Sequence, residues 1–255
     1  MSFDAAGNVY GTTANGGTDD SCFSGCGTIF EITPSNGGWT ENIIFDFLAI
    51  GTGYAPTCGL VFDGNGNLYG TASGGGAGYG TVYELTRSGS SWSQTVLYNF
   101  HGQNDGGFPY AGLLLDGGNL YGAAAGINVD GGPPSTAFEL SPNNGNWDFQ
   151  VLSVIPAISG PFATPTMDAA GNLYDTTAVA GPDWSGTVFK LTPSNGSWIY
   201  TGLYAFGLCD TNNGCDPTSG VVIDAAGNLY GTAQSGGNLA DCGGNGCGVV
   251  WEITP

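Results

Sequence analysis

Four residues of the chain could carry out acid–base chemistry, and they fall at two places. His101 is the one histidine and precedes Asp105 by four residues in a glycine-containing segment, whereas Asp175 and Lys190 replace the glycine and the glutamate of other repeat copies. A carboxylate beside a lysine can shift in pKa and exchange protons with a substrate, and a lone histidine is a weaker sign of the same chemistry. These four are therefore candidate catalytic residues. The simpler structural interpretations are an exposed surface histidine at His101 and an ion pair between Asp175 and Lys190 on adjacent strands.

Aromatic residues and aspartates gather in the segments that differ most between repeats. Aromatic rings stack on the apolar faces of sugars, while carboxylates and amides bind the hydroxyl rim. The candidate ligand-binding residues are Tyr54, Tyr79, Asp105, Phe108, Tyr110 and Trp184. They predict a module that binds an extracellular glycan. Two alternatives remain open: a glycoside hydrolase or polysaccharide lyase with loop carboxylates about 5–10 Å apart, and a structural surface repeat without catalysis.

Six of the seven cysteines form pairs that close short loops. The pairs are Cys22 with Cys26, Cys209 with Cys215, and Cys242 with Cys247; Cys58 stays unassigned. Local disulfides of this kind persist in oxidising compartments, so we expect a secreted or cell-surface protein, with no signal segment in this chain. Structural zinc usually needs four cysteine or histidine ligands, and one histidine is too few for a typical mixed site. No metal site is predicted from these cysteines.

Calcium is the one cofactor that the loop carboxylates and carbonyls would suit, because it prefers oxygen ligands. The segment 63–67, Asp-Gly-Asn-Gly-Asn, resembles the start of a calcium loop. Leu68 stands where such a loop needs glycine, and no glutamate follows at the required spacing. A hairpin turn with an aspartate cap is therefore the better interpretation of this segment.

The charge of the chain excludes two classes of partner. Its 255 residues carry a net charge of −19, and only 9% of them are charged. Such a surface repels nucleic acid and anionic lipid. No apolar run approaches the roughly 20 residues that span a membrane, so we expect no membrane insertion.

A repeat positions these residues. The unit Asp-x-x-Gly-Asn-Leu-Tyr, once shortened by one residue, begins at Asp4, Asp63, Asp116, Asp168 and Asp224. Each copy reads as four short strands, which in the second copy are expected at 59–62, 67–72, 80–86 and 92–100. A period somewhat above 50 residues with strands and no helices predicts an all-β, five-bladed propeller of four-stranded antiparallel blades in a single domain, 1–255. The blades should span approximately 1–47, 59–100, 112–155, 164–206 and 220–255.

Two further expectations follow from the repeat. A tryptophan after each third-strand turn (Trp39, Trp92, Trp147 and Trp198) should pack between neighbouring blades. The last blade should lack its outer strand and leave Gly248 to Thr254 as an unprotected edge, which invites pairing with another chain. Because the turns after strands one and three are nearly uniform, the opposite face with its variable loops is the predicted working face.

The units Asp-x-x-Gly-Asn-Leu-Tyr-Gly-Thr-Thr and Gly-Thr-Val-Phe-Glu-Leu-Thr-Pro, with the loop Gly102 to Pro109, resemble the GloVer-type tandem-repeat family. Proteins of that family are secreted or surface-anchored in bacteria. The resemblance covers nearly the whole chain and implies an exported, propeller-like protein. It implies no activity and no catalytic residues. The first unit is also similar to strands of NHL and gluconolactonase-like propellers, but the metal-binding acidic residues of the latter are not recognisable in this sequence.

Overall fold

The protein is all-β, and five antiparallel sheets follow one another along the chain. The computed structural model describes residues 1–127, 131–209, 213–238, 240, 242–244 and 246–255. Four sheets have four strands and the fifth has three, and within each sheet the strands pair in chain order. The helical structure within these ranges is one 3₁₀ turn, Cys242–Gly244, and none of it has the length and apolar character to span a membrane.

Each sheet is a blade, and each four-stranded blade runs from a short inner strand to a long outer one. Blade 1 contains β1 (Ser2–Phe3), β2 (Val9–Thr13), β3 (Thr28–Ser35) and β4 (Gly38–Asp46). Blade 2 contains β5 (Val61–Phe62), β6 (Leu68–Ala72), β7 (Thr81–Ser88) and β8 (Ser91–Asn99). Blade 3 contains β9 (Leu114–Asp116), β10 (Asn119–Ala124), β11 (Ser135–Asn143) and β12 (Asn146–Ile155).

Blade 4 contains β14 (Thr166–Met167), β15 (Leu173–Thr177), β17 (Thr187–Ser194) and β18 (Ser197–Ala205). Blade 5 contains β19 (Val222–Ile223), β20 (Leu229–Ala233) and β21 (Val249–Ile253). A separate ribbon pairs β13 (Ala157–Ser159) with β16 (Val179–Ala180) in the loops of blade 4. The five-bladed propeller and its three-stranded last blade confirm the sequence-based prediction.

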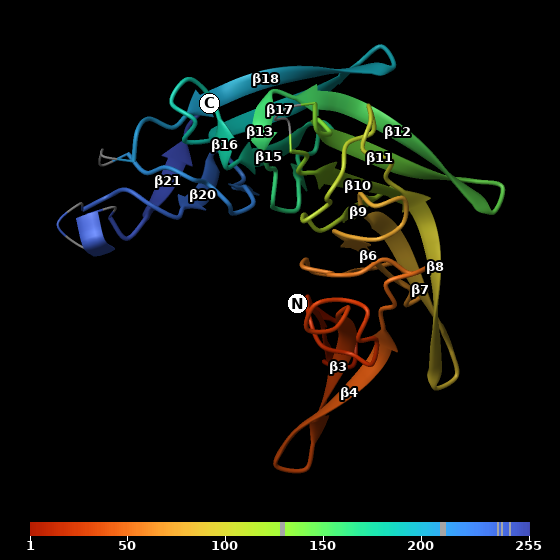
Figure 1. Cartoon of the computed structure of the whole chain (residues 1–255). Helices are drawn as coiled ribbons and strands as arrows, with labels where there is room; N and C mark the ends of the chain where they lie inside the picture. Colours follow the sequence, from red (N-terminus) through yellow and green to blue (C-terminus); the bar gives the residue numbers. More distant parts are fainter. Residues whose placement is uncertain (128–130, 210–212, 239, 241, 245) are drawn as a thin grey trace.

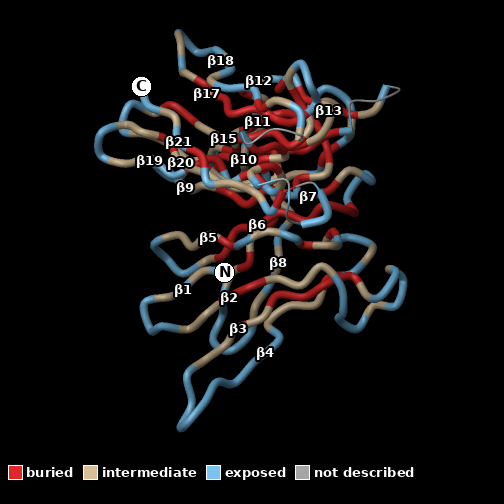
Figure 2. The backbone as a smooth tube through the Cα atoms, turned by 90° about the vertical axis from the view of Figure 1, so that its left-hand side faces the viewer, coloured by how far each residue is buried: buried red, intermediate tan, exposed pale blue. Residues whose placement is uncertain are grey.

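The blades stand around a common axis in an arc, with blade 1 at one end and blade 5 at the other (Figure 1). The outer strands β4, β8, β12 and β18 follow the rim of this arc. Buried segments concentrate in the strands of the middle blades, whereas the hairpin tips and much of blade 1 are exposed (Figure 2). The core of the protein is therefore divided among the junctions between blades.

Two kinds of contact join neighbouring blades. Threonine hydroxyls on the second strands donate to carbonyl oxygens that precede the next inner strand: Thr12 to Cys58, Thr71 to Ala111 and Thr176 to Ser219, at 2.8, 2.8 and 2.9 Å. The predicted tryptophans Trp92, Trp147 and Trp198 pack against Tyr10, Tyr69 and Tyr121 of the preceding blade, with ring centroids 6.3, 5.8 and 6.5 Å apart. The prediction is wrong for Trp39, which is 61% exposed because blade 1 is the first described blade.

The repeated aspartate caps a tight turn, as the sequence predicts. Asp63 Oδ1 accepts the backbone N–H groups of Asn65 and Asn67 at 2.8 and 2.9 Å, and Asp63 Oδ2 accepts the Asn67 side-chain amide at 2.9 Å. The Tyr69 hydroxyl donates to Glu84 of the next strand at 2.9 Å. Both oxygens of this carboxylate are thus engaged within the turn, which leaves the turn a structural role.

The inner strands differ from the prediction, since four of the five contain only two residues. The segments that lead into these short inner strands form backbone hydrogen bonds with neighbouring loops. In the junction before blade 3, Phe108 N–H donates to the Tyr79 carbonyl at 2.7 Å, and the Phe108 carbonyl accepts Ala125 N–H at 3.2 Å. These bonds join the segment that connects blades 2 and 3 to a loop of each blade.

Candidate functional site

The loop that follows β8 gathers four of the residues predicted from the sequence. Asp105 lies at its centre: Asp105 Oδ2 accepts the backbone N–H of His101 at 2.8 Å and lies 3.2 Å from His101 Nδ1. The same oxygen accepts the Tyr98 hydroxyl at 2.8 Å, while Asp105 Oδ1 accepts Gln103 N–H at 3.2 Å. A single carboxylate therefore fixes the path of the loop and the orientation of the imidazole.

The electrostatics of this loop favour a charged Asp105. Partial burial alone would raise the pKa of Asp105, but the hydrogen bonds from His101, Tyr98 and Gln103 outweigh burial and lower it. Burial and the bond to Asp105 raise the pKa of Tyr98, so its hydroxyl keeps its proton. The His101 side chain is 61% exposed, in contrast to 14% for Asp105. The imidazole thus contacts Asp105 through Nδ1, and most of the rest of the ring is exposed to solvent.

An aromatic pair borders the same loop. The rings of Tyr79 and Phe108 meet edge to face with centroids 5.6 Å apart. There is no room for a side chain at Gly102, because an added Cβ would lie 2.3 Å from the Tyr79 ring. Phe108 adopts a left-handed backbone conformation with φ 54°, which places its ring in the junction between blades 2 and 3. Tyr79, His101, Asp105 and Phe108 therefore form one cluster, here called the loop cluster.

The other predicted aromatic residues lie in separate contacts. Tyr54 is 38% exposed and forms an isolated β-bridge with Gly74, and Trp184 is 59% exposed in the loop before β17. Tyr110 pairs with Phe162, with ring centroids 5.7 Å apart. Among the described residues, none of the contacts recorded for Tyr54, Tyr110 or Trp184 reaches His101 or Asp105. The sequence correctly marked these loops as aromatic but could not show which rings meet.

The expected ion pair between Asp175 and Lys190 does not form. Asp175 pairs with Phe189 across the strands, whereas Lys190 pairs with Tyr174, so the two side chains project to opposite faces of blade 4. Lys190 places its ammonium 5.7 Å from the centre of the Tyr174 ring. Asp175 is 2% exposed, and burial raises its pKa well above the ordinary value despite a 2.7 Å bond from Thr176 N–H. This pair offers no shared proton-transfer chemistry.

Among the described residues, one group of potential metal ligands lies in the segment between blades 4 and 5, but its donors do not suit an ion. Cys209, Cys215 and Asp216 place one ligand atom each within 4.8 Å of one another. The two cysteines form a disulfide, as do Cys22 with Cys26 and Cys242 with Cys247. A disulfide sulfur carries no thiolate charge and is a poor ligand. Burial raises the pKa of Asp216, which further weakens it as a ligand. All three predicted disulfides are confirmed, and Cys58 is the free cysteine.

Two clefts open on the face that carries the Asp-x-x-Gly-Asn turns, opposite the predicted working face. One, of about 550 Å³, lies between blades 1 and 2 and is lined by Phe3, Phe62, Arg87 and Trp92 among others. The other, of about 530 Å³, lies between the corresponding turns of blades 4 and 5. The guanidinium of Arg87 stands 5.6 Å from the centre of the Trp92 ring. Sequence reasoning missed this arginine, although it is the one departure from the proline found at positions 34, 142, 193 and 255.

The successive meander blades, with their repeated turn and strand sequences, define a tandem-repeat β-propeller. The chain belongs to the Gloeobacter/Verrucomicrobia repeat family, whose model matches residues 1–238. This match confirms the resemblance that the repeat units indicated. No curated protein matches the chain.

Several solved structures share the fold at low sequence identity. A protein of unknown function from Dyadobacter fermentans is 14% identical with a TM-score of 0.51, and the match covers 90% of this chain and 72% of that one. A gluconolactonase from Xanthomonas campestris is 14% identical with a TM-score of 0.49, covering 89% of this chain. A luciferin-regenerating enzyme is 14% identical with a TM-score of 0.49, covering 92% of this chain and 75% of that one. This chain spans 65% of the length of the gluconolactonase. Likeness at this level concerns the fold and not the activity.

Proposed function

We propose that this propeller is a secreted module that binds neutral extracellular carbohydrate through the loop cluster. The observation that carries the proposal is that the Tyr79 ring, paired with Phe108, lies against Gly102, the residue after His101, whose imidazole contacts Asp105. A sugar presents an apolar C–H face to an aromatic ring and hydroxyl groups to polar side chains. The loop cluster supplies both kinds of surface within one loop and its neighbour.

The loop cluster is also rigid before any ligand arrives. Asp105 binds two residues of the loop, His101 and Gln103, and Tyr98 of β8, and its pKa is lowered by those bonds, so the carboxylate stays ionised near neutral pH. A preorganised loop loses little conformational entropy on binding. The net charge of −19 favours neutral over anionic glycans, because like charges repel across the surface. The three disulfides are compatible with an extracellular location.

A glycan array followed by calorimetry, with and without calcium, tests this proposal. Phe108→Asn removes the ring while asparagine tolerates the left-handed backbone, so we expect about tenfold weaker binding of the selected glycan without unfolding. Phe23→Ala is the matched control, since Phe23 is a 96% exposed ring on the loop of another blade. Equal loss in both variants, or no glycan bound by the parent protein, would leave the structural surface repeat as the better interpretation. A dependence on calcium would identify the ion as part of the site.

A second candidate function rests on the contact between His101 and Asp105. A carboxylate 3.2 Å from Nδ1 orients the imidazole, as a general base requires. A polysaccharide hydrolase or lyase would then release products, and His101→Gln would abolish release even at a saturating concentration of polysaccharide. A hydrolysis screen that detects no products from any bound polysaccharide excludes this second function and leaves the binding proposal intact.

A further inference from the structure

Three junctions between blades share one backbone arrangement on the variable-loop face. In each, the residue before a proline donates its N–H to a loop of the preceding blade and accepts an N–H from the following blade. These residues are Ala55, Phe108 and Asp216, and their backbones are left-handed with φ of 55°, 54° and 55°. The left-handed conformation is unfavourable for residues other than glycine. Each junction nevertheless presents a side chain from this position: a methyl group, a ring and a carboxylate.

The junction between blades 4 and 5 combines the same kinds of side chain as the loop cluster. Asp216 N–H donates to the Ser185 carbonyl at 2.9 Å, which matches the bond from Phe108 in the loop cluster. Trp184 directly precedes Ser185, and its ring is 59% exposed. Asp216 Oδ2 lies 3.8 and 3.9 Å from the sulfurs of the neighbouring disulfide, which have no proton to donate. An exposed ring and a carboxylate that can accept hydroxyl groups thus flank one inter-blade hydrogen bond.

The backbone conformation of Trp184 is a second sign of a binding role. Trp184 closes a turn onto Gly181 that Gly78 closes in blade 2 at the same distance before the third strand, with N···O distances of 3.3 and 2.9 Å. Both residues have a positive φ, 59° for the tryptophan and 103° for the glycine. A bulky residue is strained in this conformation, and burial does not offset the strain because the ring is exposed. Strain of this kind gathers at ligand-binding positions.

Aromatic rings also occur between these two junctions. Tyr110 and Phe162 occupy the same place in successive blades, directly after the proline that leads into the inner strand. Their ring centroids are 5.7 Å apart, and Tyr110 is 36% exposed. Tyr110 also follows Phe108 of the loop cluster by two residues. Since blades 3 and 4 are successive members of the arc (Figure 1), this pair lies between the loop cluster and the junction that carries Trp184.

We propose that the variable-loop face binds a neutral polysaccharide chain along a track of three subsites, a proposal that rests on the proposed function of the loop cluster. The loop cluster is the first subsite, Tyr110 with Phe162 is the second, and Trp184 with Asp216 is the third. Sugar units stack on the rings through their C–H faces, and their hydroxyl groups donate to the carboxylates. Because successive units belong to one chain, binding of one unit raises the effective concentration of the next at its subsite. Affinity should therefore rise with chain length.

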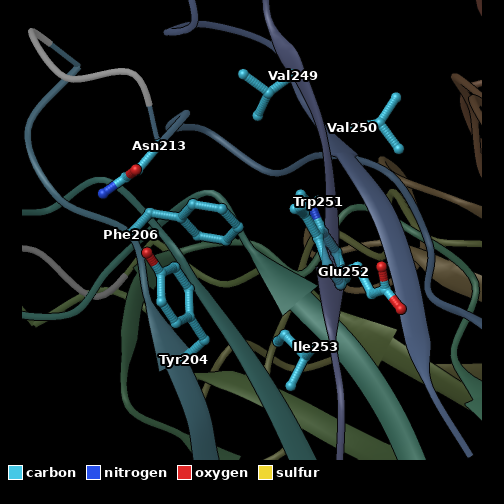
Figure 3. Close-up of a pocket in the computed structure, with 8 residues that line it drawn as sticks. All are labelled: Tyr204, Phe206, Asn213, Val249, Val250, Trp251, Glu252 and Ile253. Atoms are coloured by element: carbon cyan, nitrogen blue, oxygen red, sulfur yellow. The ribbon is translucent and has the colours of Figure 1, made fainter.

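A cavity of about 350 Å³ beside β21 is separate from this track. It is lined by Tyr204, Phe206 and Trp251 among others (Figure 3), and the residues of the track are not among the described residues that line it. Tyr204 is 40% exposed there, close to the 36% of Tyr110. Tyr204→Ala therefore removes an aromatic ring of comparable exposure and serves as one control. Trp39→Ala is the second control, since Trp39 is 61% exposed beside a turn of the opposite face.

Calorimetry with the intact chain tests the track. The probes are the disaccharide and the octasaccharide of the neutral cello-, xylo-, manno- and malto-oligosaccharide series. For the series that binds, we expect the octasaccharide to bind about tenfold more tightly than the disaccharide. Trp184→Gly, which fits the left-handed backbone, should lower the octasaccharide affinity about tenfold and leave the disaccharide affinity unchanged. Phe108→Asn should weaken both ligands, whereas both control variants should bind as the parent protein does.

Three results would overturn this inference. They are the absence of binding in all four series, an octasaccharide that binds no more tightly than the disaccharide, and an octasaccharide affinity that Trp184→Gly leaves unchanged. In the last two cases, weaker binding by Phe108→Asn would keep the proposed function of the loop cluster intact. If the loop cluster binds no sugar, Phe108→Asn and the parent protein should bind every oligosaccharide equally, which separates failure of the proposed function from failure of the track.

Discussion

Blades 2 and 5 contain the same second strand in two different surroundings. Both β6 and β20 read Leu-Tyr-Gly-Thr-Ala. All five residues are buried in β6, whereas only the first and last are buried in β20. The intra-blade contacts are the same, because the tyrosine hydroxyl donates to the glutamate of the third strand at 2.9 Å in blade 2 and 3.1 Å in blade 5.

The difference between the two strands lies in the neighbouring blade. Thr71 of β6 donates to the Ala111 carbonyl ahead of blade 3, and blade 3 covers Tyr69 and Val82. Its counterpart in β20, Thr232, is exposed and faces no described blade. The repeat sequence thus determines which strands form in a blade, whereas contact with the following blade determines how much of the second strand is buried. A tandem-repeat propeller gains its stability mainly at junctions, so a blade that contacts one described neighbour should be less stable than a blade between two.

Asp175 gives the largest expected effect of burial by a neighbouring blade, which is a dependence of the unfolding free energy on pH. Burial between blades 3 and 4 raises its pKa, so the folded state binds a proton that the unfolded state releases above about pH 4. Stability should therefore fall as pH rises from about 4 towards the raised pKa, by about 1.4 kcal/mol per pH unit. Asp175→Asn should remove this slope in urea unfolding measured from pH 4 to 8. Asp183→Asn, in an exposed loop of the same blade, is the control and should keep the slope.

Two valines at equivalent positions in blades 2 and 5 show directly how much burial by the next blade contributes to stability. Val82 is completely buried and Val250, at the equivalent place in blade 5, is 78% exposed. We expect Val82→Ala to cost about 2 kcal/mol of unfolding free energy and Val250→Ala less than about 0.5 kcal/mol. Urea unfolding followed by tryptophan fluorescence gives both values. Equal costs would show that the edge of blade 5 is covered in solution and that its exposure is not a property of the free protein.

Much of the architecture could be predicted from the sequence because the repeat is both local and periodic. The Asp-x-x-Gly-Asn turns, the strands beside them and the short cysteine loops each depend on residues a few positions apart. The three-stranded last blade followed from the same alignment of copies. The exposure of Trp39 did not, because it depends on whether another blade stands before blade 1.

The candidate site was harder to predict, since it depends on contacts between loops. The sequence placed His101 and Asp105 in one segment but did not predict their contact, and Tyr98, which donates to Asp105 from β8, was missed. The ion pair of Asp175 with Lys190 was a wrong prediction that strand alternation could have corrected. Asp175 pairs with Phe189, so Lys190, one residue along, must face the other side.

The smallest expected effect comes from removing one hydroxyl at a junction between blades, that of Thr71, which also lies 3.0 Å from Cys58 Sγ. Thr71 donates to the Ala111 carbonyl at 2.8 Å in a buried junction, and Thr232 is its exposed equivalent in blade 5. Thr71→Val keeps the shape of the side chain and leaves that carbonyl without its donor, so we expect a loss of about 1 kcal/mol, against almost none for Thr232→Val. Thermal unfolding of the two variants beside the parent protein measures the difference. If Thr232→Val were as costly as Thr71→Val, the hydroxyl would stabilise the strand itself, and the junction would owe its stability to packing alone.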